Sequence, residues 1–586
     1  MSGAGPDGGR ASGGATARPV PGWLVDRSPG AVAGDVTAGL TVAVLLVPQT
    51  MAYAVIAGLP PITGLYAALG SILVYAFVGT SSHLGYGPVA IVALLSASAV
   101  GPVAAGDPVR FAALSALLAL MVGAVHVLLG ALKAGLVVDL ISHPVIVGFT
   151  SAAALVIGLT QAKDLLGVDV ERSERVVEAV ASVVAVAGDA HPATVAVGAA
   201  AIAVLLVLRR VAPRLPAALL VSVAGIVATL AADLEARGVS PVGEIPAGLP
   251  LPAVPALAVS DLVALAPAAV LVGLISFAES ISIGKAIAGR SRERLDANRE
   301  LVASGAANAA SGLLGGFAVA GSFSRSFLLY RSGGRTRRAG LISGLVLVLV
   351  LAVLTPVLEP LPRAVLGAIV VVTVLGLIDV REARRVIAVD RRDGAVLLAT
   401  FVATLVLGVE LGLAVGVGLN VVVHVARGMR PELVELGRLP GTRVFRNTAV
   451  QPGVTAGPDG LILRLDGPLD FLSARSTGEG VRAAVARHPG LRWMVMDCGG
   501  VSGLDSTGLH TLHDLRSELE AAGVRLALAK VRAPQRAVIE RAGLGAELLH
   551  GTAHASVDEA LAALGVPDDH PLRAPADDEV RTPEQY

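Results

Sequence analysis

Three polar side chains, Gln49, Glu279 and Arg325, lie within long apolar stretches of this sequence. A charged group inside a membrane span is costly and usually has a function. Arg325 can attract or neutralise an anion, and the amide of Gln49 can donate a hydrogen bond to it. Burial favours the protonated form of a carboxyl group, so Glu279 is a candidate proton carrier at neutral pH. The structural alternatives are that Glu279 pairs with Arg325 or Lys285, and that Arg325 extends to the membrane surface.

Two short segments, residues 86–90 and 321–325, combine Gly, Pro and Ser at the start of apolar stretches. A helix that begins inside the membrane offers free N–H groups and a partial positive charge to an anion. Pro88 suits the first position of such a helix and Gly87 frees the backbone before it, while the second segment has serines able to cap. Ordinary kinked or re-entrant helices are the alternative. The predicted anion-binding residues are Gln49, Tyr53, Gly87, Pro88, Val89, Ser322, Phe323, Ser324 and Arg325.

The composition indicates a membrane protein and excludes several other classes. Of the 586 residues, 54% are hydrophobic and only 16% are charged, against about 25% charged residues in soluble domains. The 46 basic and 46 acidic residues balance, so no basic surface for nucleic acid is expected. The single cysteine, Cys498, excludes an intramolecular disulfide and a multi-cysteine metal site.

Residues 32–425 form a nearly continuous series of apolar stretches separated by short Gly, Pro and Arg breaks. One spanning helix needs about 20 residues, and the pattern predicts fourteen spans. The segments at 86–90 and 321–325 each lie at the third span in a block of seven spans. This order is typical of transporters with inverted repeats. The spans centre on residues 41–54, 64–78, 89–100, 111–129, 145–160, 194–208, 217–230, 263–281, 301–315, the piece after 324, 341–354, 364–377, 396–407 and 411–425.

Arginines in four short loops predict the orientation. In a fourteen-span count these loops share one side with the N-terminus, and the rule that cytoplasmic loops are basic places both termini in the cytoplasm. The loops between them are acidic or mixed. The arginines are Arg209, Arg210 and Arg214; Arg290, Arg292, Arg294 and Arg299; Arg331, Arg335, Arg337 and Arg338; and Arg381, Arg384, Arg385, Arg391 and Arg392.

The pattern changes after Arg430. Apolar runs at 461–465, 493–496 and 524–529 predict strands, and residues 473–487, 507–522 and 534–542 predict helices. Strands that alternate with helices indicate a small α/β domain. We therefore predict a disordered N-terminal tail over 1–24, which lacks the apolar core of a signal peptide, a membrane domain over 25–430, the α/β domain over 437–565 and a disordered tail over 566–586.

A series of motifs resembles the SulP family of anion permeases, relatives of the sulfate permeases. They occur in order as DVTAGL (35–40), VPQTMAYA (47–54), AGLPP (57–61), GLY (64–66), GTS (79–81), GP (87–88), ISHPV (141–145), VGEIP (242–246), FAES (277–280), NREL (298–301) and GSFSRS (321–326). The segment DSTGL (505–509) resembles the STAS domain, a module that these permeases share with bacterial anti-sigma-factor antagonists. The resemblance covers roughly residues 25–565.

The resemblance implies fourteen helices in two inverted seven-helix repeats, organised as a core and a gate domain. It also implies a homodimer in the bacterial plasma membrane. The implied activity is secondary active transport of sulfate or a similar oxyanion, with Glu279 coupling protons. Some family members carry an acid where this chain has Gln49, so a dicarboxylate is less favoured. A bicarbonate transporter driven by sodium is the nearest alternative. In the antagonist relatives the residue matching Ser506 accepts phosphate, which makes Ser506 a candidate phosphorylation site.

A protein of another class remains open: a membrane-anchored regulator whose STAS domain binds partners and which has lost transport. Three polar residues inside apolar spans argue against a simple anchor. The sequence has no nucleophile–base pair, no Gly-rich phosphate loop and no metal-ligand cluster, so we predict no enzyme and no cofactor.

Overall fold

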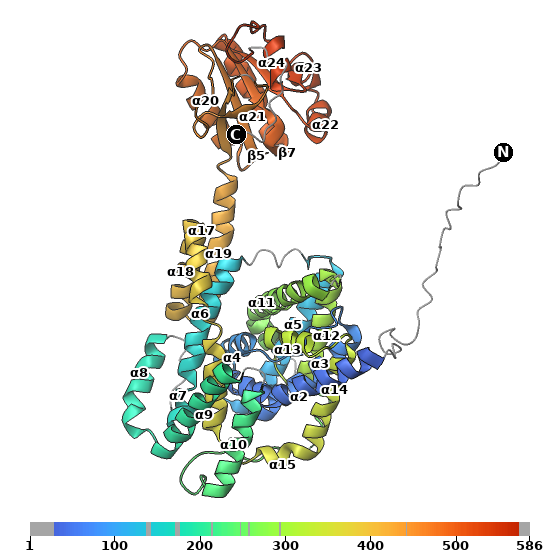
Figure 1. Ribbon diagram of the computed structural model, residues 1–586, viewed down its shortest axis with the longest axis vertical. Coiled ribbons are helices and arrows are strands. Elements are labelled where there is room, and N and C mark those ends of the chain that lie inside the picture. The colour runs from blue at the N-terminus through green and yellow to red at the C-terminus, as the bar shows by residue number, and fades with distance from the viewer. Residues whose placement is uncertain are drawn as a thin grey trace, which may run out of the picture. The chain divides into compact units, whose positions relative to one another are not determined.

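Each stretch that the sequence marks as a membrane span falls on helical residues in the computed structural model (Figure 1). The structure describes residues 29–135, 142–169, 176–212, 215–246, 248–255, 258–291, 293, 295–440 and 442–573. The predicted N-terminal tail and the arginines Arg214, Arg292 and Arg294 lie outside these residues. The chain divides into two compact units, one ending at Asn420 and one starting at Val421.

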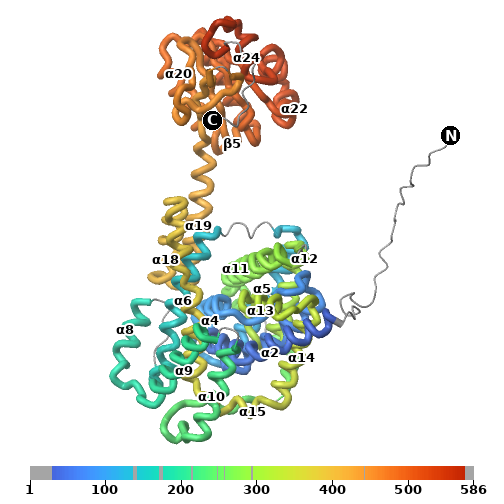
Figure 2. Tube along the Cα trace, in the orientation of Figure 1, coloured from blue at the N-terminus to red at the C-terminus, as the bar shows by residue number. Residues whose placement is uncertain are grey.

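The first unit is built of helices, which Figure 2 traces from blue to yellow along the chain. Among the described residues, nine helices are long and apolar enough to cross a membrane, and α4 and α10 are apolar but shorter. The helices are α2 (Pro29–Ile56), α3 (Pro61–Val78), α4 (Ala90–Ala104), α5 (Pro108–Ala131), α6 (His143–Thr160), α7 (Ala162–Leu166), α8 (Val176–Val186), α9 (Pro192–Val211), α10 (Ala217–Ala232), α11 (Val259–Ser291), α12 (Ala297–Leu313), α13 (Phe323–Arg331), α14 (Arg338–Leu349), α15 (Thr355–Leu358), α16 (Arg363–Leu375), α17 (Val380–Val389), α18 (Arg391–Leu407) and α19 (Val409–Gly428).

Small residues let these helices approach closely. A Cβ atom added at Gly123 on α5 would lie 2.8 Å from the carbonyl oxygen of Gly305 on α12, and one added at Gly305 would lie 2.7 Å from the oxygen of Gly123. The two backbones are therefore in direct contact. Close backbone packing of this kind is how membrane helices associate where no hydrophobic effect separates helix from lipid.

Two buried carboxylates join helices from the two halves of the membrane domain. Asp35 on α2 is fully buried and accepts hydrogen bonds from the backbone N–H groups of Arg335 (2.7 Å) and Thr336 (2.9 Å), just before α14. Glu300 on α12 accepts a 2.5 Å hydrogen bond from the hydroxyl of Tyr75 on α3. Burying a carboxylate is costly unless it is hydrogen-bonded. These hydrogen bonds therefore hold the helices that they join in fixed positions relative to one another.

The second unit contains a mixed sheet with the order β4-β3-β5-β6-β8-β9, and β7 pairs with β5. Strands β5, β6, β8 and β9 are parallel, and β3 runs antiparallel to both of its neighbours. The elements are β3 (Glu432–Arg438), β4 (Phe445–Asn447), β5 (Gly460–Leu469), α20 (Ala474–Ala486), β6 (Trp493–Asp497), β7 (Val501–Leu504), α21 (Ser506–Ala521), β8 (Arg525–Ala529), α22 (Ala533–Arg541), α23 (Gly545–Leu548), β9 (Ala553–His554) and α24 (Val557–Ala563).

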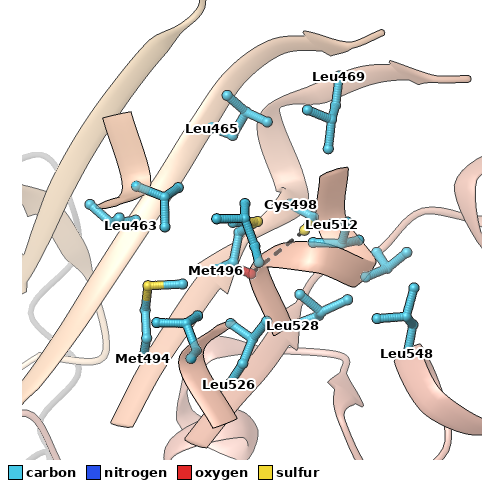
Figure 3. Packing of buried hydrophobic residues seen from close by; sticks show 14 of the residues in the cluster. Leu463, Leu465, Leu469, Met494, Met496, Cys498, Leu512, Leu526, Leu528 and Leu548 are labelled. Atoms are coloured by element: carbon cyan, nitrogen blue, oxygen red, sulfur yellow. Dashed lines mark hydrogen bonds between the residues drawn. The ribbon is translucent and has the colours of Figure 1, made fainter. Parts of the chain in front are cut away.

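The core of this unit lies between the sheet and its helices, as Figure 3 shows. Leu463, Met496 and Leu528 are partners on three neighbouring strands, and Leu512 of α21 belongs to the same cluster. The thiol of Cys498 is buried there and donates to the carbonyl of Met496 at 3.6 Å. The three predicted strands and three predicted helices are all present, and the structure adds β3, β4, β7 and β9.

One domain boundary differs from the prediction. Residues 566–573, which we assigned to a disordered tail, pack against the α/β unit. Leu572 is 1% exposed, and its carbonyl oxygen accepts a 2.8 Å hydrogen bond from Nη1 of Arg438. The polar residues of this segment mask two apolar side chains, Val566 and Leu572, that are buried in the core of the unit. Residues 574–586 lie outside the described part of the chain.

Candidate functional site

The two Gly-rich segments meet in the structure. Strand β1 (Gly85–Gly87) lies two residues before α4, and β2 (Ala320–Ser322) directly precedes α13. The strands pair antiparallel, with Gly85 opposite Ser322 and Gly87 opposite Ala320. Because the strands are antiparallel and each leads toward a helix, α4 and α13 start from opposite ends of the strand pair. The first residues of both helices line one cavity.

Neither helix has a side-chain cap. Val89 and Ser322 occupy the N-cap positions of α4 and α13, and neither side chain bonds a first-turn N–H group. The hydroxyl of Ser322 instead lies 3.2 Å from that of Ser324. The sequence offered serines able to cap this helix, and the one at the N-cap position does not do so. The first backbone N–H groups of both helices are therefore available to donate hydrogen bonds to another acceptor.

The backbone before α4 differs in part from the prediction. Helix α4 begins at Ala90, two residues after Pro88, so Pro88 is not its first residue. The chain extends instead through Pro88 and Val89 after the strand. Gly87 has φ = +147°, a conformation that side-chain-bearing residues rarely adopt, which confirms the need for glycine there.

A cavity of about 1050 Å³ opens at these helix starts. Its walls come from α2, α4, α11 and α13 on one hand and from α9, α10 and α16 on the other. Three predicted residues, Gly87, Pro88 and Arg325, are not part of its lining. The predicted residues that do line it are Gln49, Tyr53, Val89, Glu279, Ser322, Phe323 and Ser324.

Gln49 and Tyr53 form a pair on α2. They are four residues apart and so share a helix face, and Nε2 of Gln49 donates a 2.8 Å hydrogen bond to the hydroxyl of Tyr53. The hydroxyl hydrogen of Tyr53 is left to donate elsewhere. Oε1 of Gln49 is buried and has no hydrogen-bond partner within the described part of the chain. The pair therefore presents polar atoms to the cavity from α2.

Arg325 lies behind the strand pair and does not reach the surface. Its side chain is 0% exposed, and Nη2 donates a 2.8 Å hydrogen bond to the carbonyl of Pro88. Its Nε and Nη1 atoms are buried without a partner among the described residues. The alternative in which Arg325 extends to the membrane surface is therefore wrong, and its charge stays beside the helix starts.

Glu279 projects from α11 into the cavity wall. Its Oε2 atom is buried and has no hydrogen-bond partner among the described residues. Within that part of the chain, no ion pair joins Glu279 to Arg325 or to Lys285. The structure therefore does not show the purely structural ion pair that was the alternative to a role in proton transfer. A carboxyl group that faces a cavity without a fixed partner is free to exchange a proton with it.

Several polar residues that hold the strand pair were not assigned a role from sequence. Oδ1 of Asn308 accepts from the N–H of Val319 (2.9 Å). The hydroxyl of Ser280 accepts from the N–H of Gly321 (2.8 Å), and that of Ser326 accepts from the N–H of Gly85 (2.8 Å). Ser280 follows Glu279, and Ser326 follows Arg325. Both serines therefore belong to motifs, FAES and GSFSRS, from which a role at the site could have been predicted. No group of three or more His, Cys, Asp or Glu side chains in the described residues is placed to hold a metal ion.

Ser506 is the first residue of α21 in the α/β unit and is exposed. The carboxylate of Asp505, before it, caps the helix by accepting from the N–H of Gly508 (2.8 Å). Its second oxygen accepts from the N–H of Phe471 (2.9 Å). The turn is thus held by Asp505, and the hydroxyl of Ser506 is accessible at a helix N-terminus.

Apolar helices around a cavity that holds a few polar side chains, followed by an α/β domain, define a multi-pass membrane protein. Residues 32–400 match the model of the sulfate permease family, and residues 446–560 match the STAS domain. The chain belongs to the sulfate permease family.

Named relatives agree with this assignment. A probable sulfate transporter of Mycobacterium tuberculosis is 36% identical over 512 residues, covering 87% of this chain and 91% of that protein. A chloroplastic sulfate transporter of Arabidopsis thaliana is 35% identical over 528 residues, covering 87% of this chain and 77% of that protein.

Solved structures share the fold. The murine solute carrier 26 family member A9, described as an anion transporter in the inward-facing state, superposes with a TM-score of 0.86 at 21% identity and 93% coverage of both chains. The transmembrane domain of a cyanobacterial bicarbonate transporter has a TM-score of 0.59 at 24% identity, covering 66% of this chain and 97% of that one. At these identities the likeness concerns the fold.

Proposed function

We propose that this chain transports a small inorganic anion, sulfate first, across the bacterial plasma membrane in symport with protons. One observation carries the proposal: the N-termini of α4 and α13 line the same cavity, lack side-chain caps among the described residues, and share that cavity with a few polar side chains. Free N–H groups at two helix starts suit a small anion. The relatives named as sulfate transporters favour sulfate over bicarbonate or a dicarboxylate.

The anion is held by hydrogen-bond donors of fixed position. We assign this role to the first N–H groups of α4 and α13, the hydroxyls of Ser322 and Ser324, and the donor that Tyr53 retains when Gln49 donates to it. Phe323 and Val89 complete the wall with apolar surface. Neutral donors bind an anion without holding it too tightly, as release requires.

Arg325 supplies positive charge without contact. Its guanidinium is buried behind the strands and engaged by Pro88, so it cannot form a bidentate pair with the anion in this conformation. Its charge still lowers the energy of an anion at the helix starts, because a charge in a low-dielectric interior acts over several ångströms. We propose that it offsets the charge of the anion.

Glu279 sets the coupling to protons in this proposal. An ionised carboxylate in the same cavity repels a divalent anion, and protonation removes that repulsion. Entry of the anion is then favoured when Glu279 holds a proton, and both leave together on the other side. Sodium is the alternative coupling ion, and a sodium-driven flux without pH dependence favours it.

The two sides of the cavity fit a moving core and gate. Helices α2, α4, α11 and α13 carry the binding residues, and α9, α10 and α16 face them. We propose that these two groups rock against each other to expose the site alternately. A homodimer, cytoplasmic termini and a regulatory role for the STAS domain, with Ser506 as its candidate phosphorylation site, belong to the same proposal.

Uptake into proteoliposomes tests the function. The purified chain is reconstituted into vesicles whose outside is more acidic than the inside, so that the proton gradient is directed inward. Uptake of radiolabelled sulfate is then measured with unlabelled sulfate, bicarbonate, chloride and dicarboxylates as competitors. We expect saturable sulfate uptake that collapses when a protonophore dissipates the gradient. Absence of flux for every anion tested would contradict the proposal and favour a membrane-anchored regulator.

A further inference from the structure

Helix α17 (Val380–Val389) is a ten-residue segment between α16 and α18. One face packs on the membrane helices: Val386 is 9% exposed and clusters with Val147 of α6 and Leu397 of α18, with Ala383 beside them. Figure 1 shows α17 next to α18. The remaining faces of this short helix are open.

An apolar edge adjoins the packed face. Val380 and Ile387 lie seven residues apart, which places them on the same edge of the helix, and they are 53% and 39% exposed. Val389, at the last turn, is 80% exposed and lies on the other side of the packed face. Apolar side chains exposed beside membrane helices fit a surface that touches lipid.

A basic edge follows around the helix. Arg381 and Arg384 are exposed and have no acidic partner among the described contacts. The nearby acids are already used: Asp379 caps the helix by accepting from the N–H of Glu382 (2.9 Å). The Glu382 carboxylate lies 3.0 Å from His143 and 3.8 Å from Arg385.

We propose that α17 lies in the membrane surface and binds the headgroups of anionic phospholipids. A helix with a packed face, an apolar edge and a basic edge has the form of an interfacial helix, whose apolar side enters the acyl boundary while arginines meet headgroup phosphates. The arginine fork suits phosphate oxygens. Anionic lipid is abundant at the cytoplasmic surface, which is the side on which the orientation predicted from the basic loops places α17.

This binding would act on the cavity through the chain. Helix α16, which leads into α17, supplies Ile369, Val372 and Thr373 to the cavity wall. Lipid held at α17 therefore fixes the end of a helix that faces the proposed anion site. The inference concerns lipid and stands on α17 alone, so it does not depend on which anion is carried.

Lipid binding by the purified full-length chain in neutral detergent tests the proposal. Phosphatidylglycerol or phosphatidylcholine is titrated in mixed micelles, and binding is followed by the thermal unfolding midpoint and by mass spectrometry of retained lipid. We expect phosphatidylglycerol to raise the midpoint and to be retained, with an effect that weakens as salt is added. Equal effects of both lipids would overturn the proposal.

Matched variants locate the site. The double variant Arg381→Gln/Arg384→Gln is expected to weaken phosphatidylglycerol binding about tenfold or more, while Arg381→Lys/Arg384→Lys keeps most of it. The control Arg525→Gln/Arg541→Gln removes two exposed arginines of the α/β unit and should bind as the unaltered chain does. Unchanged binding by the Gln variant, or displacement of the lipid by equal concentrations of soluble glycerol phosphate, would contradict a lipid-headgroup site at α17.

Discussion

Arg325 and Pro88 join the two halves of the candidate site: Nη2 of Arg325 on α13 donates a 2.8 Å hydrogen bond to the carbonyl oxygen of Pro88, two residues before α4. A backbone carbonyl is a negative dipole end and would repel an anion. The guanidinium engages that oxygen and adds a positive charge beside both helix starts. One buried side chain thus links the segments geometrically and electrostatically.

Replacing Arg325 should stop transport while the fold survives. We expect Arg325→Ala to lower sulfate uptake at least about tenfold, since a loss of about 1.4 kcal/mol in anion stabilisation is one order of magnitude. Arg325→Lys should recover part of it, because lysine keeps the charge without the planar fork. Arg331→Ala, an exposed arginine on the same helix, is the control. Normal uptake by a well-folded Arg325→Ala protein would exclude the role.

Gly87 is expected to resist substitution. Its φ of +147° is strained for any other residue, and a Cβ atom there would lie 3.3 Å from Nη2 of Arg325. Gly87→Ala should therefore lower stability by about 1–3 kcal/mol and reduce uptake. Gly101→Ala, on α4 with nothing within 4 Å of the added methyl, should do neither. Equal thermal midpoints for the two variants would show that the strained conformation is unimportant.

The Tyr53 hydroxyl should contribute to anion affinity. Tyr53→Phe removes both the acceptor of the Gln49 hydrogen bond and the donor offered to the cavity. Loss of one hydrogen bond costs about 1 kcal/mol, which corresponds to a rise in KM for sulfate of about fivefold. Initial uptake rates across a range of sulfate concentrations measure it, with Tyr66→Phe on α3 as control. An unaltered KM would remove Tyr53 from the binding residues.

Glu279 should decide the response to a pH gradient. Glu279→Gln keeps the size of the side chain but cannot exchange a proton, so uptake should lose its dependence on the gradient. Counterflow of labelled against unlabelled sulfate, which needs no net proton movement, is expected to survive in part. If the gradient still drives uptake in Glu279→Gln, the proton is carried elsewhere.

His83 and Glu293 form a pair 3.6 Å apart outside the membrane helices. Burial lowers the pKa of His83, but the contacts with Glu293 and the Gly334 carbonyl outweigh it and raise the pKa above 6.5. Burial raises the pKa of Glu293, but contacts with His83 and Ser82 outweigh it and lower the pKa below 4.5. The contribution of His83 to the free energy of unfolding is complete below pH 6.5 and is lost as the pH rises through the raised pKa of His83. The glutamate contribution is complete above pH 4.5 and is lost as pH falls through its lowered pKa.

The His83–Glu293 pair therefore stabilises the protein most between pH 4.5 and pH 6.5. We expect His83→Gln to lower the thermal midpoint by about 2 °C at pH 5.5 and by less at pH 8. Midpoints of both proteins across that range measure the difference. A deficit that is the same at both pH values would assign the effect to packing.

The sequence predicted the helices well and the contacts between them poorly. Apolar length is set by the membrane itself, so each predicted span fell on a helix. The strands β1 and β2 have three residues each and gain their order from Asn308, Ser280 and Ser326, which lie elsewhere in the chain. The buried carboxylates Asp35 and Glu300 likewise find partners more than 200 residues away. No local pattern encodes such partners.

The position of Arg325 shows the same limit. The motif GSFSRS identified it as an unusual charge in the membrane, but only the structure shows that it is buried beside the strand pair and outside the lining of the cavity. The segment offered serines able to cap α13, but Ser322 at the N-cap position makes no cap bond and lies 3.2 Å from the hydroxyl of Ser324. Strand β3 was missed because Glu432 and Glu435 interrupt its apolar pattern.

The most direct measurement is the location of a bound anion. Selenate has the shape and charge of sulfate and scatters X-rays anomalously, so crystals of the full chain grown with selenate reveal where it binds. We predict one strong anomalous peak in the cavity between the first residues of α4 and α13, lost when excess sulfate is added. Peaks confined to other sites, or a cavity that stays empty while the protein transports selenate, would contradict the account.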